Sequence, residues 1–244
     1  MTGSLIVVWF RLLRLRQRIS IADLPIRPAG MFVAIVLALG AGPGALATTG
    51  AEVGQRPESR PEATILVLGD SISAGYGIQR EQSWVSQLGS RVAGEAQGWR
   101  VVNASVSGET TSGGLARLPD ALEAHDPEVV IIELGGNDGL RGYPIDRIRQ
   151  NLEHMVALAK DTGSRVLLVG MQIPPNYGPR YTRAFAAVFE EVAEAHEIPL
   201  VPFILEQVAL RPELMQGDGI HPTGAAQELL LDAVWPYLAP LLDD

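Results

Sequence analysis

From residue 64 onward, short apolar runs alternate with amphipathic stretches. The apolar runs lie at 64–69, 100–106, 129–134, 165–171 and 199–202, and their length and β-branched residues are typical of buried strands. Stretches with helical periodicity lie at 82–96, 111–124, 145–162, 181–196 and 223–241. Regular alternation of this kind predicts an α/β fold, a three-layer α/β/α sandwich around a five-stranded parallel sheet.

The first 63 residues follow a different pattern. Arginines at 11, 14, 16, 18 and 27 precede an apolar run from Met31 to about Leu39, and small residues with Ala45-Leu46-Ala47 follow it. This order predicts a signal peptide over 1–47 with cleavage after Ala47. The next stretch, 48–63, is rich in Gly, Pro, Glu and Arg and predicts a flexible leader, so that 64–244 forms one domain.

The N-terminal segment is also compatible with a misplaced start codon or a retained anchor. Its basic region is long, and its apolar run is shorter than the ~20 residues that a membrane span needs. We expect a periplasmic or secreted protein without stable membrane insertion after cleavage.

Charge and composition exclude several classes of binding partner. The chain has a net charge of −9, and removal of 1–47 would leave −13. An acidic domain of this kind has no electrostatic footprint for nucleic acid or an anionic lipid surface. It has no cysteine, which excludes disulfides and a lipid-anchored cysteine, and its four histidines show no ligand spacing. We therefore expect no metal and no cofactor, and a monomer that acts on a small molecule.

Polar residues with catalytic potential follow the predicted strands. The first strand stops at Gly69-Asp70-Ser71, which puts a hydroxyl at the carboxyl end of a strand, where open α/β sheets carry their chemistry. Near the C-terminus, Asp218 and His221 are close enough for the carboxylate to reach one ring nitrogen and leave the other for Ser71. We expect Asp70 to close the turn by accepting backbone N–H bonds instead of taking part in the reaction.

Each motif alone is also compatible with a purely structural role. Gly-Asp-Ser is a common turn, Asn137-Asp138 suits a turn or helix cap, and the pair Asp218 and His221 suits the start of a helix. The motifs nevertheless occur together, in order, at the ends of predicted strands. This combination favours a catalytic site.

These motifs resemble the SGNH hydrolases, also called the GDSL family. The four signature blocks are Gly69-Asp70-Ser71, Gly108, Gly135-Gly136-Asn137-Asp138 and Asp218 to His221. The resemblance covers roughly Thr64 to Leu242 and is strongest to the periplasmic thioesterase, arylesterase and lysophospholipase branch. One departure is Ile72, where the family name expects Leu, a volume-conserving difference.

The resemblance implies a flavodoxin-like sheet and a role for each matching residue. Ser71 would be the nucleophile, His221 the general base and Asp218 its orienting partner. The oxyanion hole would consist of the backbone N–H groups of Ser71 and Gly108 and the side-chain amide of Asn137. In this branch the loop matching 172–180 lies over the acyl groove, so Ile173, Pro174 and Tyr177 are candidate substrate contacts, although an ordinary strand-to-helix connection would account for them equally well.

The expected activity is hydrolysis of carboxylic esters and thioesters through an acyl-enzyme on Ser71. A peptidase side activity, a glycan O-acetylesterase and a binding module without turnover are alternatives. The α/β-hydrolase fold is disfavoured, because position 73 is Ser where a Gly-x-Ser-x-Gly elbow requires Gly.

Overall fold

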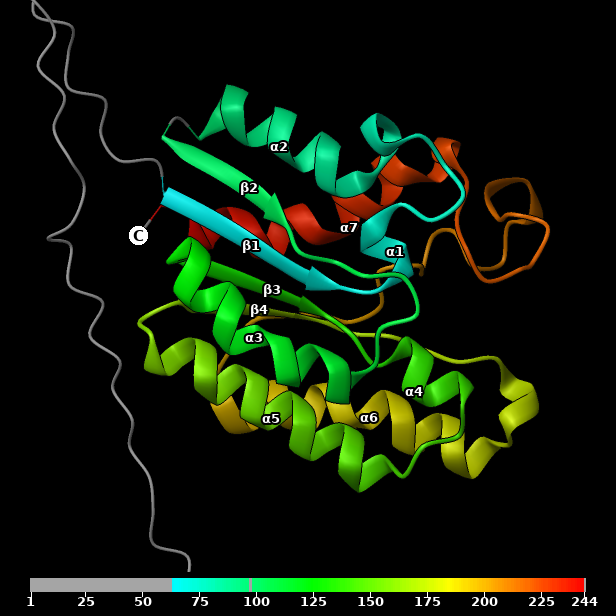
Figure 1. Cartoon of the computed structure of the whole chain (residues 1–244). Helices are drawn as coiled ribbons and strands as arrows, with labels where there is room; N and C mark the ends of the chain where they lie inside the picture. Colours follow the sequence, from blue (N-terminus) through cyan, green and yellow to red (C-terminus); the bar gives the residue numbers. More distant parts are fainter. Residues whose placement is uncertain (1–62, 97, 244) are drawn as a thin grey trace, which may run out of the picture. The chain divides into compact units, whose positions relative to one another are not determined.

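The computed structural model describes residues 63–96 and 98–243 (Figure 1). The predicted signal peptide 1–47 and all of the predicted leader except Ala63 lie outside the described residues.

A five-stranded sheet forms the centre of the predicted domain. Its strands are all parallel and stand in the order β2-β1-β3-β4-β5. The bounds are β1 Ala63–Gly69, β2 Trp99–Asn103, β3 Val129–Glu133, β4 Arg165–Val169 and β5 Leu200–Val201. The predicted five-stranded parallel sheet is therefore confirmed.

Helices cover both faces of the sheet. α2 (Trp84–Glu95) and α7 (Gln227–Leu238) pack together on one face, and α3 (Thr111–His125), α5 (Ile145–Asp161) and α6 (Pro179–His196) cover the other (Figure 1). Because neither face meets water, the central strands can be apolar throughout, and β3 is buried at every position. The periodicity visible in the sequence therefore corresponds to helices that each bury one stripe on this sheet.

Several element bounds differ from the predicted ones, and the local residues account for the differences. α2 begins at Trp84 because the Ser83 hydroxyl accepts from the Ser86 amide and caps the helix. β5 has two residues because Pro199 and Pro202 on either side lack the N–H that a longer ladder requires. The predicted helix 223–241 consists of α7 between two 3-10 turns, Gly224–Ala226 and Ala239–Leu241.

The sheet reverses its winding direction at β1. The chain passes from β1 to β2 on one side and then to β3 on the other, which creates a switch point at the carboxyl ends of β1 and β3. Two short helices follow these ends directly, α1 (Ser71–Ala74) after β1 and α4 (Gly136–Leu140) after β3 (Figure 1). The polar motifs of the sequence meet here.

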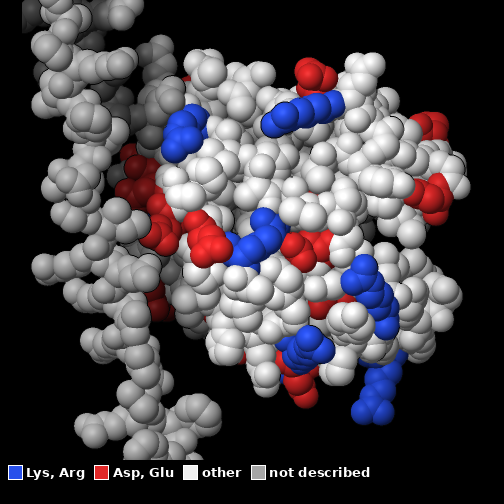
Figure 2. Space-filling model, viewed as in Figure 1, with Lys and Arg blue, Asp and Glu red and all other residues white. Residues whose placement is uncertain are grey.

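Charged side chains on the face shown in Figure 2 are interspersed. Lys and Arg side chains lie singly there, next to acidic ones, and do not merge into a continuous basic surface on that face. Within the described residues, no helix combines the length and apolar character needed to cross a membrane.

Candidate active site

Ser71, His221 and Asp218 form a continuous hydrogen-bonded line. His221 Nε2 lies 2.9 Å from Ser71 Oγ, and His221 Nδ1 lies 2.6 Å from Asp218 Oδ2. The other carboxylate oxygen of Asp218 accepts from the backbone N–H groups of Ile220 at 2.9 Å and His221 at 3.0 Å. The structure thus brings together the three residues that the sequence nominated as nucleophile, base and orienting acid.

Asp218 fixes which nitrogen of His221 carries the proton. Hydrogen bonds from the His221 backbone, the His221 ring and the Ile220 backbone lower the pKa of Asp218 to about 2, so the carboxylate is ionised at neutral pH. An ionised carboxylate only accepts, so Nδ1 donates to it. Nε2 is then free to accept the proton of the Ser71 hydroxyl.

The turn between β1 and α1 presents Ser71. Asp70 is the N-cap of α1, and its Oδ1 accepts from the Ile72 amide at 3.0 Å, as expected for a residue that closes the turn. Gly75 ends the helix in the left-handed conformation, with φ of 72°. Ser71 occupies the first position of α1, where a backbone N–H has no carbonyl one turn earlier to bond. That N–H can serve an oxyanion.

Asn137 is held by the same aspartate. Its Nδ2 donates to Asp70 Oδ2 at 3.0 Å, so one carboxylate binds both the turn that carries Ser71 and the amide at the end of β3. One hydrogen of the amide is used in this contact, and the second remains for a ligand. Asp70 therefore does more than the expected turn closure, because it also orients a candidate oxyanion donor.

Gly108 lies on the exposed loop between β2 and α3. Its φ is +80°, and a Cβ built there would meet no atom within 4 Å. The backbone conformation, not lack of space, therefore favours glycine at this position. Its carbonyl accepts from Arg141 Nη2 at 3.2 Å.

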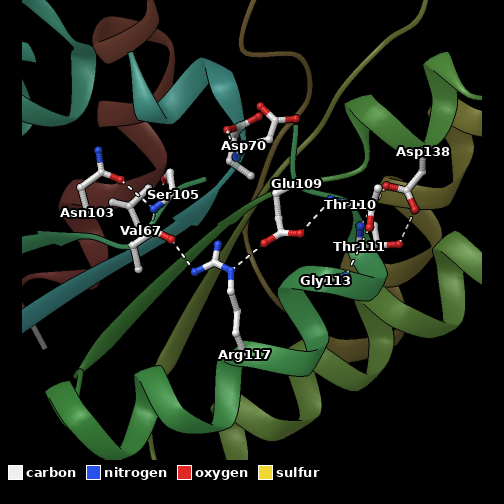
Figure 3. Close-up of polar contacts among 12 residues, drawn as sticks. Val67, Asp70, Asn103, Ser105, Glu109, Thr110, Thr111, Gly113, Arg117 and Asp138 are labelled. Carbon is white, nitrogen blue, oxygen red and sulfur yellow. Dashed lines mark hydrogen bonds and ion pairs between the residues drawn. The ribbon is translucent and has the colours of Figure 1, made fainter. Parts of the chain in front are cut away.

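Arg117 binds both ends of the loop that contains Gly108, one of them through an ion pair (Figure 3). Arg117, from α3, donates through Nε to Glu109 at 2.7 Å and through Nη1 to the Ala104 carbonyl at 2.5 Å. Because both side chains are largely shielded from solvent, this pair is less weakened by water than an exposed one. We did not predict it from the sequence, where the only signal is an acid and an arginine eight residues apart.

A second contact joins the Gly108 loop to the Asn137 turn (Figure 3). Asp138 is fully buried, and its carboxylate accepts from the Thr111 amide at 2.9 Å and from the Thr111 hydroxyl at 2.6 Å. Thr111 is the first residue of α3, and Asp138 follows Asn137 directly. The two segments with candidate oxyanion donors are therefore fixed to each other.

A buried glutamate lies beneath the nucleophile turn. Glu133 Oε2 accepts from the Ser73 hydroxyl at 2.6 Å and from the Asp70 amide at 3.3 Å. Burial and, next, the charge of Asp70 raise the pKa of Glu133 well above its ordinary value. Burial likewise raises the pKa of Asp70 to about 6, although the bonds from Ile72 and Asn137 oppose the shift. We did not predict this contact from the sequence, where the signal that could have indicated it is a lone carboxyl at the end of an apolar strand.

The three candidate substrate contacts lie in different environments. Ile173 is 8% exposed and packs in the core beside α4, so it has little surface to offer a substrate. Pro174 is exposed, and Tyr177 donates its hydroxyl to the Leu140 carbonyl at 2.7 Å. Tyr177 also lines a depression of about 480 Å³.

The remaining histidines lie apart from this site on helices, His125 and His196 at the ends of α3 and α6 and His154 within α5. Over 63–96 and 98–243, no group of three or more His, Cys, Asp or Glu residues could hold a metal ion.

Comparison with known proteins connects this geometry to a family. A model of the GDSL-like lipase/acylhydrolase family matches residues 67–229. Esterase TesA of Pseudomonas aeruginosa is 54% identical over 179 residues, which cover 73% of this chain and 89% of that protein. Thioesterase 1/protease 1/lysophospholipase L1 of Escherichia coli K12 is 42% identical over 180 residues, 74% of this chain and 85% of that protein.

A solved structure of an esterase supports the same family relationship. Psychrotrophic esterase EstA from Pseudoalteromonas sp., inhibited by monoethylphosphonate, superposes with a TM-score of 0.71 at 40% identity, over 74% of this chain and 99% of that one. The family match covers well over half of the chain, and the relatives are matched over most of their length. The chain belongs to the GDSL-like lipase/acylhydrolase family.

Proposed function

We propose that this protein is a serine hydrolase of carboxylic esters and thioesters, with Ser71 as the nucleophile. The observation that carries the proposal is the unbroken line from Ser71 Oγ through both nitrogens of His221 to an ionised Asp218. A serine hydroxyl becomes an effective nucleophile only when a positioned base takes its proton.

In the acylation step, His221 Nε2 removes the proton from Ser71 Oγ while the oxygen attacks the acyl carbonyl carbon. The carbonyl oxygen becomes an oxyanion, and the Ser71 N–H, the Gly108 N–H and the Asn137 amide donate to it. Each such donor typically contributes about 2.7–4 kcal/mol of transition-state stabilisation. His221 then passes its proton to the departing alcohol or thiol, and the acyl-enzyme remains.

In the deacylation step, a water molecule attacks the acyl-enzyme, with His221 again as the base. The second tetrahedral intermediate uses the same donors and collapses when His221 Nε2 gives its proton to Ser71 Oγ, which breaks the bond to the acyl carbon, releases the carboxylic acid and regenerates the Ser71 hydroxyl. Asp218 stabilises the imidazolium form of His221 in both steps, because its negative charge lies 2.6 Å from Nδ1.

Apolar side chains near Ser71 favour a substrate with an apolar acyl group. Tyr76, Val106 and Ile220 are 53%, 49% and 42% exposed, and exposed apolar side chains that gather on one surface often mark a ligand-binding site. The Tyr76 ring lies 4.5 Å from the His221 ring, Ile220 precedes His221, and the Val106 amide donates to the Gly69 carbonyl at 3.0 Å. Tyr76 therefore contacts the base directly, and Ile220 and Val106 belong to segments that adjoin His221 and the Ser71 turn.

The names of the relatives support the same substrate class, since they include esterase, thioesterase and lysophospholipase. The Escherichia coli relative is also named a protease, which keeps a peptidase side activity as a second candidate. A glycan O-acetylesterase would need polar groups for sugar hydroxyls, whereas the exposed side chains of Tyr76, Val106 and Ile220 are mainly apolar.

The test is kcat/KM for p-nitrophenyl acetate, butyrate, hexanoate and octanoate, together with an acyl-CoA, a lysophospholipid and an acetylated sugar. Four additional buried methylene groups at about 0.8 kcal/mol each should raise kcat/KM by about two orders of magnitude from acetate to hexanoate. Ser71→Ala should abolish turnover of every substrate. A profile that falls from acetate onward, or a preference for the acetylated sugar, would contradict the proposed substrate class.

We also propose that the protein is exported. The support is the arginine-rich segment followed by an apolar run and Ala45-Leu46-Ala47. The test is the mass and N-terminal sequence of the protein from the periplasm or medium of an expressing bacterium. A chain that begins at Thr48 is expected, and an uncleaved chain in the cytoplasmic fraction would contradict export.

A further inference from the structure

The segment that carries His221 and Asp218 has little regular secondary structure. Gly217 to Ile220 are exposed, and 39% of the Asp218 side chain is open to solvent. His221 is nevertheless held 2.9 Å from a nucleophile 150 residues earlier in the chain. Contacts outside the line from Ser71 to Asp218 must therefore hold this segment in place.

Gln216 makes these contacts with both its backbone and its side chain. Its backbone N–H donates to the His221 carbonyl at 2.7 Å. Its side-chain Nε2 donates to the Pro222 carbonyl at 2.9 Å and to the Tyr76 carbonyl at 2.8 Å. The last of these bonds joins the segment of the base to the segment of the nucleophile.

The bonds close a ring around the reacting pair. The Tyr76 amide donates to the Ser71 carbonyl at 3.1 Å. From Ser71 the ring runs through Tyr76 to Gln216, from Gln216 to His221, and from His221 Nε2 back to Ser71 Oγ. The Tyr76 side chain adds a direct contact, because its ring lies 4.5 Å from the imidazole at an interplanar angle of 41°.

The chemistry at position 216 matches a primary amide. The NH₂ group of Gln216 has two hydrogens, and two carbonyl oxygens accept from it. A carboxylate there would face both carbonyls with acceptors only. The Gln216 side chain can lie this close to the Tyr76 segment because residue 77 is glycine, since a Cβ there would collide with Gln216 Oε1.

We propose that Gln216 is a positioning residue, whose side-chain amide fastens the His221 segment to the Ser71 turn and so sets the distance between Ser71 Oγ and His221 Nε2. This inference rests on the proposed function, in which these two atoms exchange a proton. It assigns Gln216 no contact with substrate. Its loss should lower kcat and leave KM nearly unchanged.

The test compares Gln216→Met, which keeps the length without donors, with the isosteric Gln216→Glu. Misplacement of a reacting group by about 1 Å can cost about 10²-fold, and we expect a kcat loss of about this size with KM changed less than about threefold. Gln87→Ala is the matched control. Gln87 lies on α2, and its side-chain amide also donates to a backbone carbonyl, that of Gln82. The control should keep wild-type kcat.

A double-mutant comparison separates positioning from a general structural role. Gln216→Met is combined with His221→Ala, and the residual hydrolysis is measured together with Tm. With no imidazole to position, Gln216→Met should change the residual rate less than about twofold. An equal loss of rate in both backgrounds, or a wild-type kcat in both Gln216 variants, would overturn the role of Gln216.

Labelling of the wild-type protein by a fluorophosphonate distinguishes this outcome from failure of the proposed function. If Ser71 is labelled and the Gln216 variants behave as wild type, only the positioning role fails. If wild-type Ser71 is not labelled, the proposed function fails and the positioning role fails with it.

Discussion

Replacement of Asn137 by Ala would remove one of the three candidate oxyanion donors. The Asn137 amide donates one hydrogen to Asp70 Oδ2 at 3.0 Å, which aims the second hydrogen without the involvement of substrate. Loss of such a preorganised donor typically costs about 2.7–4 kcal/mol, or about 10²–10³-fold in kcat. Because the full negative charge exists only in the tetrahedral species, KM should change far less than kcat.

The same change has a predictable effect on stability. Asp70 Oδ2 would lose its side-chain donor in a buried site, and an unsatisfied buried acceptor costs about 1–3 kcal/mol. The hydrogen bond from Asn137 lowers the pKa of Asp70, so that pKa should rise above about 6 in the variant. Denaturant unfolding at neutral pH would measure the loss of stability separately from the loss of kcat.

Steady-state kinetics with a p-nitrophenyl ester would test this reasoning. Asn151→Ala is the control, because Asn151 is also half-buried and donates from Nδ2, to the hydroxyls of Thr111 and Ser112, but lies on α5. It should lose stability and keep kcat within a few-fold. A kcat of Asn137→Ala within tenfold of wild type, or an effect on KM alone, would exclude Asn137 as an oxyanion donor.

Three further changes test how the site is held. Arg117 and Glu109 are replaced by Ala, singly and together, and kcat of each variant is converted to an activation free energy. The loss in the double variant should differ from the sum of the two single losses by roughly 0.5–3 kcal/mol, whereas additive losses would show that the pair does not act on the site. Burial raises the pKa of Asp70 from 3.8 to about 6, so the folded state binds an extra proton between these values. The contribution of Asp70 to the free energy of unfolding should therefore fall as pH rises through that window. In denaturant titrations Asp70→Asn should show a smaller fall than wild type, and the remainder belongs to Glu133, whose pKa is also raised; identical curves for the two proteins would contradict the assignment. Gly139→Ala should lose about 1–3 kcal/mol, because its Cβ would lie 2.7 Å from Ile173 Cγ2, and an unchanged Tm would count against the packing described.

The sheet could be predicted because parallel strands covered on both faces are continuous apolar runs. The run at 129–134 corresponds to β3, Val129–Glu133, and the run at 64–69 to β1, Ala63–Gly69. The polar residues directly after these runs had to meet, since the carboxyl ends of parallel strands share one edge. Ser71 and Asn137 therefore lie at the same edge, each next to Asp70.

The supporting contacts could not be predicted in the same way. Gln216 and Tyr76 are 140 positions apart, and a polar residue in a polar loop carries no periodic signal of its partner. Arg117 could equally have been a solvated residue on the outer face of α3. Local sequence shows which residues can carry the chemistry, but the tertiary fold determines which side chains hold them.

The environment of Ile173 could not be predicted from the sequence either. An apolar residue in a proline-rich loop after a strand can face a ligand or the core, and the sequence pattern is the same in both cases. Here the side chain packs against α4 and is buried. Exposed apolar side chains occur instead at Tyr76, Val106 and Ile220, in segments next to the polar motifs of the site.

In the proposed mechanism, His221 activates Ser71 for covalent catalysis. The most direct measurement is the mass and labelled position of the protein after reaction with a fluorophosphonate. We expect one adduct per chain, located on Ser71, with no labelling of Ser71→Ala and slow labelling of His221→Ala. Labelling of another residue, or an equal rate of labelling with and without His221, would contradict this mechanism.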